Sequence, residues 1–77
     1  MHQAEYSTKP TRKAQFIIKQ AIKKHKIDIN KPINDWLIYV TEYIVRALNY
    51  NQREACRLAT TMQVIKAIEY MKENNLL

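Results

Sequence analysis

Seven basic side chains near the N-terminus are the residues whose type and spacing point most directly to a chemistry. They are Lys9, Arg12, Lys13, Lys19, Lys23, Lys24 and Lys26. Phosphate groups are bound by Lys and Arg side chains that share a surface and are not neutralised by carboxylates. Residues 1–31 carry eight Lys or Arg and two acids, a net charge of +6, whereas residues 32–77 carry five of each and are neutral. This one-sided charge predicts an anionic partner, and we expect nucleic acid, DNA in the first place.

Other interpretations of the basic residues stay open. A net charge of this size also occurs in small domains where it serves only solubility. A basic amphipathic helix can also lie on anionic lipid, although the apolar side of this one consists of Ala and Ile without Trp or Leu. A second basic row follows at Arg46, Arg53 and Arg57, and we include Arg53 and Arg57 in the expected nucleic-acid surface. An ordinary solvated face explains that row equally well.

The other titratable residues do not form a pattern expected of an enzyme. The seven acids stand singly along the chain. A nucleophilic Cys56 would need a histidine base and an orienting group, and His25 is the only histidine expected inside the fold. One cysteine and two histidines also do not provide a metal site. The absence of glycine argues against phosphate-binding loops of enzymes. We therefore expect a binding protein without catalytic activity, cofactor or metal.

Hydrophobic periodicity predicts the elements that carry the basic residues. Residues 1–9 have no periodicity and are expected to form a flexible basic arm, and residues 10–77 are expected to form a single helical domain. A first helix follows Pro10, and its apolar positions recur at helical spacing. These positions are Ala14, Ile17, Ile18, Ala21 and Ile22. The opposite side carries Arg12, Lys19, Lys23 and Lys26, with Phe16 among them.

A second helix is predicted to begin with Asn30 as N-cap and Pro32 in the first turn. Its apolar stripe runs through Ile33, Trp36, Leu37, Val40, Ile44, Ala47 and Leu48, and is met again at Ala55 and Leu58. An unbroken helix would be about 28 residues, or ~42 Å, long. Asn51 would then interrupt the stripe, and the alternative is a break within residues 49–52 that leaves two shorter helices. The resumed stripe and the missing glycine favour the continuous helix.

A last helix is predicted to begin near Thr60. Thr60 and Gln63 have the spacing of a capping box, in which each side chain satisfies a backbone donor of the other. The apolar face of this helix consists of Val64, Ala67, Ile68 and Met71. The fold class is therefore all-α, with three helices in the order short, long, short.

The second helix is apolar on several sides, which is typical of a helix that other elements surround. Two short helices cannot surround it, so a second copy or another helical protein is expected to complete the fold. The expected dimer or partner interface comprises Trp36, Ile38, Tyr39, Tyr43, Val45 and Tyr50. The alternative is that the tyrosines are half-exposed, with their hydroxyl groups in water.

A group of residues in the second half of the chain follows a known pattern, namely Thr41-Glu42, Arg46-Ala47, Arg57, Val64, Ala67 and Ile68. Through these residues, the segment 33–71 resembles the histone-fold family. The resemblance implies a head-to-tail dimer in which Lys and Arg of the first helix and the loops hold DNA phosphates. Three features depart from the family: Gln63 stands where an Asp normally pairs with an Arg, the threonine-rich loop is reduced to residues 59–61, and the central helix is about one turn short.

A second resemblance is to a helix-turn-helix of the winged-helix regulators. Residues 53–58, a turn at residues 59–61 and a helix from Gln63 would supply its scaffold and recognition helices. The recognition helix would expose mainly Gln63, Lys66 and Glu69, which is a poor set for contacting base edges.

These patterns together predict a small, basic DNA-binding protein, histone-like or transcription-regulatory, that contacts mainly the phosphate backbone. The alternative is a protein–protein interaction module, such as an adaptor, an inhibitor or a subunit of a larger complex, that uses the apolar and tyrosine surface of the central helix. No apolar run has the ~18 residues of a membrane span. The free Cys56 fits a reducing, intracellular compartment, whether cytoplasm, nucleoid or nucleus.

Overall fold

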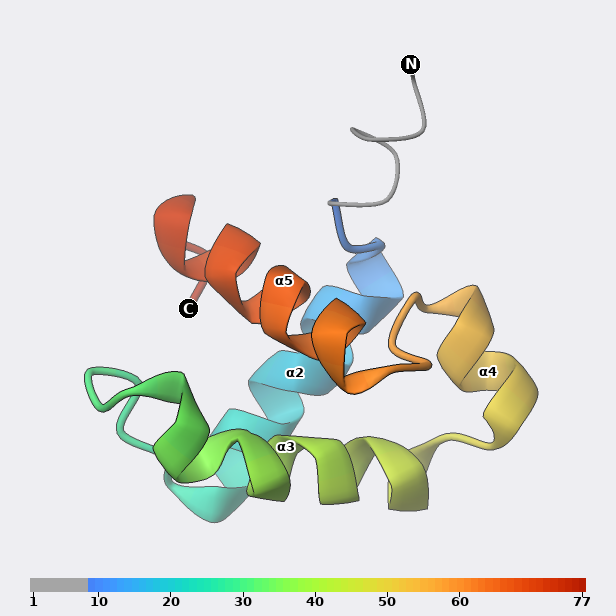
Figure 1. Ribbon diagram of the computed structural model, residues 1–77, viewed down its shortest axis with the longest axis horizontal. Coiled ribbons are helices and arrows are strands. Elements are labelled where there is room, and N and C mark those ends of the chain that lie inside the picture. Colours follow the sequence, from blue (N-terminus) through green and yellow to red (C-terminus); the bar gives the residue numbers. More distant parts are fainter. Residues whose placement is uncertain (1–8) are drawn as a thin grey trace.

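The computed structural model describes residues 9–77, which fold into helices without any strand (Figure 1). The helices are α2 (Arg12–His25), α3 (Ile33–Ala47), α4 (Tyr50–Ala55) and α5 (Thr61–Glu73). The predicted all-α class is therefore confirmed for this part of the chain. The expected flexible arm, residues 1–9, lies outside the described residues except for Lys9, which is exposed.

Helix α2 has well-defined ends. The side chain of Thr11 accepts a hydrogen bond from the backbone N–H of Ala14 at 3.0 Å, so it satisfies one of the free donors of the first turn. At the other end, Lys26 takes the left-handed conformation (φ 52°, ψ 47°). The N–H of Ile27 then donates to the carbonyl of Ile22 at 3.0 Å. Glycine usually occupies this left-handed position, but the chain contains none.

The prediction of one long central helix is wrong, because the chain breaks after Ala47. Leu48 has an extended backbone (φ −127°, ψ 143°), and Asn49 is the N-cap of α4. Its side-chain oxygen accepts a hydrogen bond from the N–H of Gln52 at 2.9 Å. Helices α2, α3 and α5 are similar in length, with 14, 15 and 13 residues, so the predicted short–long–short order is also absent.

The resumed apolar stripe that favoured continuity has a different physical origin. Ala55, which seemed in register with the stripe, is exposed. Leu48, Cys56 and Leu58 are buried, but Leu48 reaches the core from the extended link and the other two from the turn after α4. The start of α3 also differs from the prediction: the helix begins at Ile33 with Pro32, rather than Asn30, in the N-cap position.

The cap at Asn49 leads to a stability prediction. Asn49→Ala is expected to lower the free energy of unfolding by about 1 kcal/mol, because the N–H of Gln52 loses its acceptor. Urea denaturation measures this change. Asn51→Ala is the matched control, since Asn51 is exposed within α4 and should change the free energy by less than about 0.5 kcal/mol. Equal effects of the two substitutions would contradict a helix break at Leu48.

Helix α5 begins with the predicted capping box. The Thr60 hydroxyl accepts from the N–H of Gln63 at 3.1 Å, and the Gln63 side chain accepts from the N–H of Thr60 at 3.2 Å. The same Gln63 oxygen also accepts from the N–H of Ala59 at 3.0 Å. At the C-terminal end, Asn75 takes a left-handed conformation (φ 58°) and directs the last residues back towards the core.

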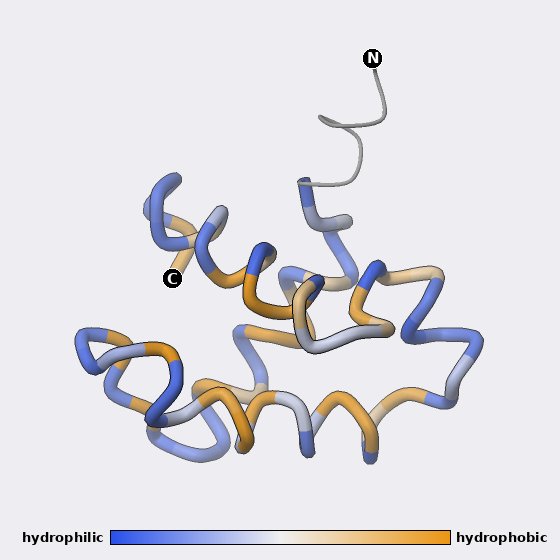
Figure 2. Tube along the Cα trace, viewed as in Figure 1, coloured by the Kyte–Doolittle hydropathy of each residue, from blue (hydrophilic) through white to orange (hydrophobic). Residues whose placement is uncertain are grey.

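Helix α2 packs against both α3 and α5, while α3 also contacts α5 and α4. Hydrophobic and hydrophilic residues alternate along each of these helices, so each has one side for the core and one for solvent (Figure 2). The core contains every apolar position predicted for the face of α5, and it contains Ala14, Ile17, Ile18 and Ala21 of α2. The packing therefore fixes which side of α2 faces away from the protein.

Candidate nucleic-acid interface

The outward side of α2 is basic because its inward side is fully used by the core. Ala14, Ile18 and Ala21 have no exposed surface. Since a helix turns 100° per residue, the positions opposite these three residues must face away from the protein. All seven predicted basic residues of this region are exposed, namely Lys9, Arg12, Lys13, Lys19, Lys23, Lys24 and Lys26.

The helical register arranges most of these residues in one row. Arg12, Lys19 and Lys23 follow spacings of seven and four, so their side chains lie one above another on the outward face. Lys13 and Lys24 lie on one flank of this row, and Lys26 follows at the helix end. From Arg12 to Lys23 the row extends about 16 Å along the helix axis. We call the seven basic residues the basic face.

The basic face is not neutralised by acids. Helix α2 contains no acidic residue, and within residues 9–77 none of the seven basic side chains forms an ion pair with a carboxylate. Three of the described carboxylates line clefts at the C-terminal end of the helix. Asp28 and Asp35 share a cleft with Lys26, and Glu42 shares another with Lys24. The positive charge is therefore least balanced over the first and middle turns of α2.

The helix dipole acts differently on the basic residues at the two ends of α2. Lys23 and Lys24 lie in the last turn, where the negative pole of the helix favours cations. Arg12 and Lys13 lie in the first turn, where the positive pole disfavours them. Helix stability alone thus explains the C-terminal pair but not the N-terminal pair. A local arrangement that opposes stability is more often found at functional surfaces.

This contrast can be tested by charge reversal. Arg12→Glu is expected to raise the free energy of unfolding by about 0.5–1 kcal/mol at low salt, whereas Lys23→Glu should lower it by a similar amount. Both substitutions change the net charge equally, so urea denaturation of the pair isolates the effect of the helix dipole. If Arg12→Glu destabilises the protein, Arg12 supports the fold and its position is no longer an argument for a ligand.

The structure does not join the second predicted group of cations to the basic face. Arg53 belongs to α4, which packs against α3 and not α2. Its guanidinium lies 5.6 Å from the centre of the Tyr50 ring, and its Nε atom is buried. Arg57 is half-buried and follows α4 with a left-handed backbone (φ 62°). We therefore leave Arg53 and Arg57 out of the candidate site.

The predicted partner interface is also divided by the fold. Trp36 is 3% exposed and its indole N–H donates to the carbonyl of Lys31 at 3.1 Å, so its assignment to an interface is wrong. Tyr43 is partly buried against the core. Tyr39 contacts His25 of α2, with ring centres 5.5 Å apart. Trp36 and Tyr43 thus pack into the domain, whereas Tyr39 keeps 47% of its surface exposed beside His25.

Tyr50, the remaining aromatic residue of that group, is exposed but engaged within its own helix. A hydrogen bond to the Glu54 carboxylate, and the negative charge of that group, raise the pKa of Tyr50 above its usual value. Arg53 covers one side of its ring. On α3, the exposed members of the predicted interface are Ile38, Tyr39 and Val45.

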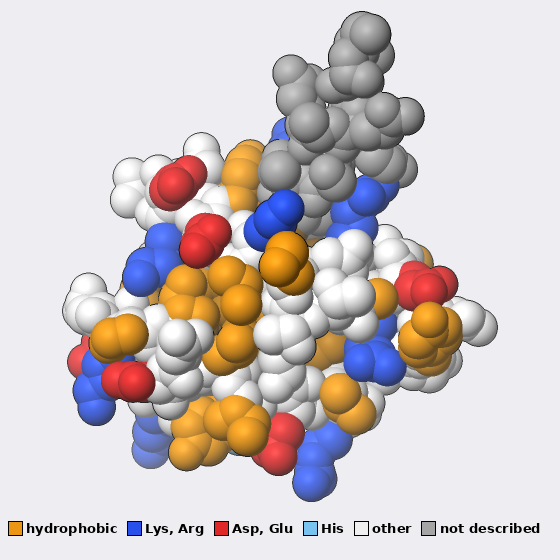
Figure 3. Space-filling model, in the orientation of Figure 1, with side chains coloured by type: hydrophobic (Ala, Val, Ile, Leu, Met, Phe, Trp, Pro, Cys, Tyr) orange, Lys and Arg blue, Asp and Glu red, His pale blue; other side chains and the backbone are white. Residues whose placement is uncertain are grey.

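Ile38 and Val45 share the outward side of α3, seven residues apart, with 60% and 57% of their surfaces exposed. Met62 of α5 is 64% exposed and was not predicted, although its position off the Val64–Ala67–Ile68 face already indicates it. In the view of Figure 3, α3 and α5 lie in front of α2, and hydrophobic side chains gather there between charges of both signs. The basic face of α2 and this apolar surface belong to different sides of the domain.

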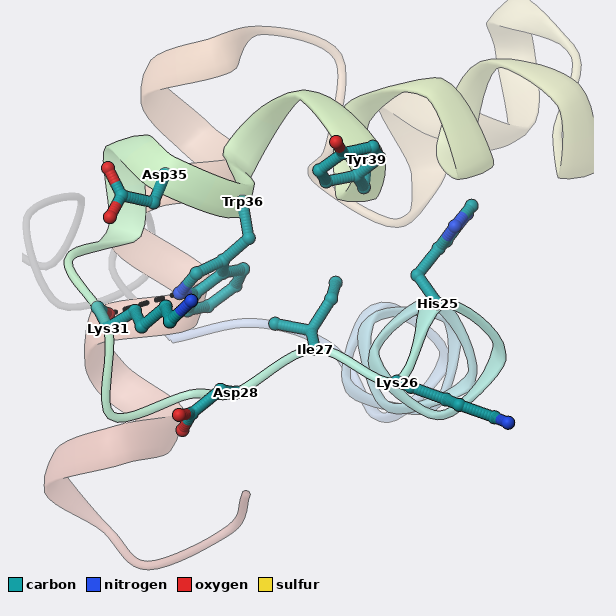
Figure 4. A pocket seen from close by; sticks show the side chains of 8 residues that line it. All are labelled: His25, Lys26, Ile27, Asp28, Lys31, Asp35, Trp36 and Tyr39. Atoms are coloured by element: carbon teal, nitrogen blue, oxygen red, sulfur yellow. Dashed lines mark hydrogen bonds between the residues drawn. The ribbon is translucent and has the colours of Figure 1, made fainter.

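A cleft lies where the C-terminal end of α2 meets the start of α3 (Figure 4). It has a volume of about 500 Å³ and is lined by residues of α2, α3 and their connection. These residues are His25, Lys26, Ile27, Asp28, Lys31, Asp35, Trp36 and Tyr39. In the close view, the Lys26 side chain extends away from the cleft, while the Trp36 indole forms its wall. Basic and acidic groups are both present, so the cleft does not extend the basic face.

Residues 9–77 hold no group of three His, Cys, Asp or Glu side chains able to bind a metal ion. None of the described helices combines the length and apolar character that crossing a bilayer requires. The basic face of α2 is therefore the strongest candidate that residues 9–77 offer.

No protein-family model, curated protein or solved structure matches this chain.

Proposed function

We propose that this protein binds nucleic acid, DNA in the first place, through the basic face of α2. The observation that supports the proposal is a row of exposed cations, without a carboxylate partner among residues 9–77, on a helix that contains no acid. The closely spaced phosphates of a nucleic acid can contact several cations of such a row at once. The contacts would be made chiefly to the backbone of the nucleic acid, and no catalytic step is part of the proposal.

The composition of the basic face favours backbone contacts over sequence recognition. Six of its seven cations are lysines and only Arg12 is an arginine. A lysine ammonium acts as a point charge, whereas the pairing that distinguishes bases is made most often by the planar guanidinium of arginine. We therefore expect binding that depends weakly on sequence and strongly on salt.

A lipid surface suits α2 less well than phosphates do. An interfacial helix inserts its apolar side into the membrane, but the apolar side of α2 is buried against α3 and α5. Only Phe16 remains on the outward side to enter a bilayer. Binding to anionic vesicles would thus depend on charge alone.

The proposal is tested by titrating a labelled random-sequence DNA duplex with the protein and following fluorescence anisotropy. Affinity should fall steeply between about 50 and about 200 mM salt, with a logarithmic slope no steeper than about −6 if all seven cations contact phosphates. A folded protein that does not bind at low salt would overturn the proposal. Binding that is insensitive to salt would overturn the backbone mechanism.

A second candidate function is the docking of another helical protein, or a second copy, on the outward side of α3. The exposed pair Ile38 and Val45 favours it, because two large aliphatic side chains one heptad apart form a seam for another helix. A histone-like or transcription-regulatory role would combine this contact with the basic face. That role stays a hypothesis, since the long central helix that the histone-fold resemblance implies is broken at Leu48.

A further inference from the structure

Phe16 is an exposed aromatic residue within the row of cations. Its side chain is 58% exposed, although α2 buries Ala14, Ile17, Ile18 and Ala21 against the core. The helix therefore does not need Phe16 for packing. A single exposed apolar residue is common on protein surfaces, so its surroundings decide what it can do.

The surroundings of Phe16 are positively charged in both directions along the helix. Arg12 precedes it by four residues and Lys19 follows it by three, so each lies about one turn away, at about 4.5–6 Å along the axis. Lys13 flanks the ring on the N-terminal side, and Lys23 continues the row one turn beyond Lys19. No acid lies on this helix. The arrangement is an aromatic face between two sets of phosphate-binding groups.

We infer that Phe16 stacks on an unpaired base and that the basic face therefore prefers single-stranded nucleic acid to duplex. This inference rests on the proposed function. A nucleotide presents a flat base and a phosphate within a few ångströms of each other, so a ring beside cations contacts both parts at once. In a duplex, the faces of the bases are covered by their neighbours, so the ring has no face on which to stack and the cations contact the phosphates alone. The preference for single strands thus comes from the ring, and the general affinity comes from the cations.

Stacking of one base on an aromatic side chain is sequence-tolerant, because every base has an aromatic face. We expect a thymine-only single strand to bind about 5- to 20-fold more tightly than a duplex of equal length at the same salt. This ratio lies in the lower part of the range for one base–aromatic stack, because Phe16 has no second ring to clamp the base. DNA and RNA single strands should behave alike in this respect, since stacking does not involve the sugar.

The test uses the full chain and three substitutions of Phe16. Phe16→Ala removes the ring, and Phe16→Leu keeps apolar bulk without an aromatic face. Both should weaken single-strand binding by about 5- to 20-fold and leave duplex binding within about twofold. Phe16→Trp should bind the single strand at least as tightly as the original chain. Its indole fluorescence should be quenched by the single strand, on whose base it stacks, but not by the duplex. Trp36 is buried and contributes a constant background to this signal. Circular dichroism confirms that each variant keeps the helical fold.

Several results would overturn the inference. Equal losses on single strand and duplex, a Phe16→Leu variant that binds like the original chain, or a preference of the original chain for duplex would each show that stacking is absent. If Phe16→Ala lost binding to anionic vesicles but bound the single strand like the original chain, Phe16 would belong to a membrane-binding surface instead. Lys19→Gln separates phosphate binding by the cations from stacking by Phe16, because it should weaken binding to the single strand and to the duplex alike. If the original chain binds neither nucleic acid at low salt, the proposed function fails together with this inference.

Discussion

Replacing Lys19, Lys23 and Lys24 with Gln is expected to lower the affinity for a short DNA duplex by roughly 100-fold near 0.1 M salt. The three side chains are exposed in the basic face, and none forms an ion pair with another residue of the described part of the chain. Each phosphate contact releases condensed counterions, so the loss of three contacts should also reduce the logarithmic salt slope by about three. Anisotropy titrations over a range of salt concentrations measure both quantities.

The matched control for this variant is the triple substitution of Lys31, Lys66 and Lys72 with Gln. These lysines are exposed and lie outside the basic face, in the connection before α3 and on α5. The control also removes three lysine charges, so the two variants have the same net charge and differ only in where the charges were removed. Equal losses in the two variants would mean that only the total charge matters. Undiminished binding by the α2 variant would show that its basic face is not the binding surface.

Ile44→Ala is expected to lower the free energy of unfolding by about 2–5 kcal/mol. Ile44 is 1% exposed between α3 and the rest of the core, and truncation leaves a cavity as well as removing apolar contacts. The total stability of a domain of this size is only about 4–12 kcal/mol, so the loss is a large share of it. Urea denaturation measures the loss, and the midpoint of thermal unfolding should fall by at least about 10 °C.

Ile38→Ala provides the control on the same helix, because Ile38 is 60% exposed. Its effect on the isolated chain should stay within about 0.5 kcal/mol. Measurements at several protein concentrations make the control informative about the second candidate function. A large, concentration-dependent loss with Ile38→Ala would show that a second copy covers this side of α3, since association adds to apparent stability by mass action.

The local structure of α2 and α5 could be predicted because it depends on neighbouring residues. The i, i+3, i+4 spacing in α2 places Ala14 and Ile18 in the core, and the basic residues then have to face outward. The capping box of Thr60 and Gln63 forms as its spacing indicates. The composition of the basic face follows from the same periodicity, so most of the candidate site is present in the sequence alone.

The break after Ala47 could not be predicted from periodicity. Leu48 keeps its place in the core with an extended backbone, so the apolar pattern does not register the change of direction. Asn49 is compatible with a helix interior, a C-terminus or an N-cap, and in the structure its side chain caps α4 by accepting from the N–H of Gln52. Trp36 was misplaced for a related reason: a large aromatic residue on an apolar helix is suitable for a core and an interface alike.

The absence of glycine also has a consequence for the unfolded chain. Three described residues, Lys26, Arg57 and Asn75, take positive φ angles that glycine would adopt without strain. Each non-glycine residue in that region costs the folded state about 1 kcal/mol. A glycine would, however, give the unfolded chain more conformations to lose, at a cost of about 0.4–1 kcal/mol. A chain of 77 residues without glycine therefore begins folding from fewer backbone conformations, which offsets part of the strain at the helix ends.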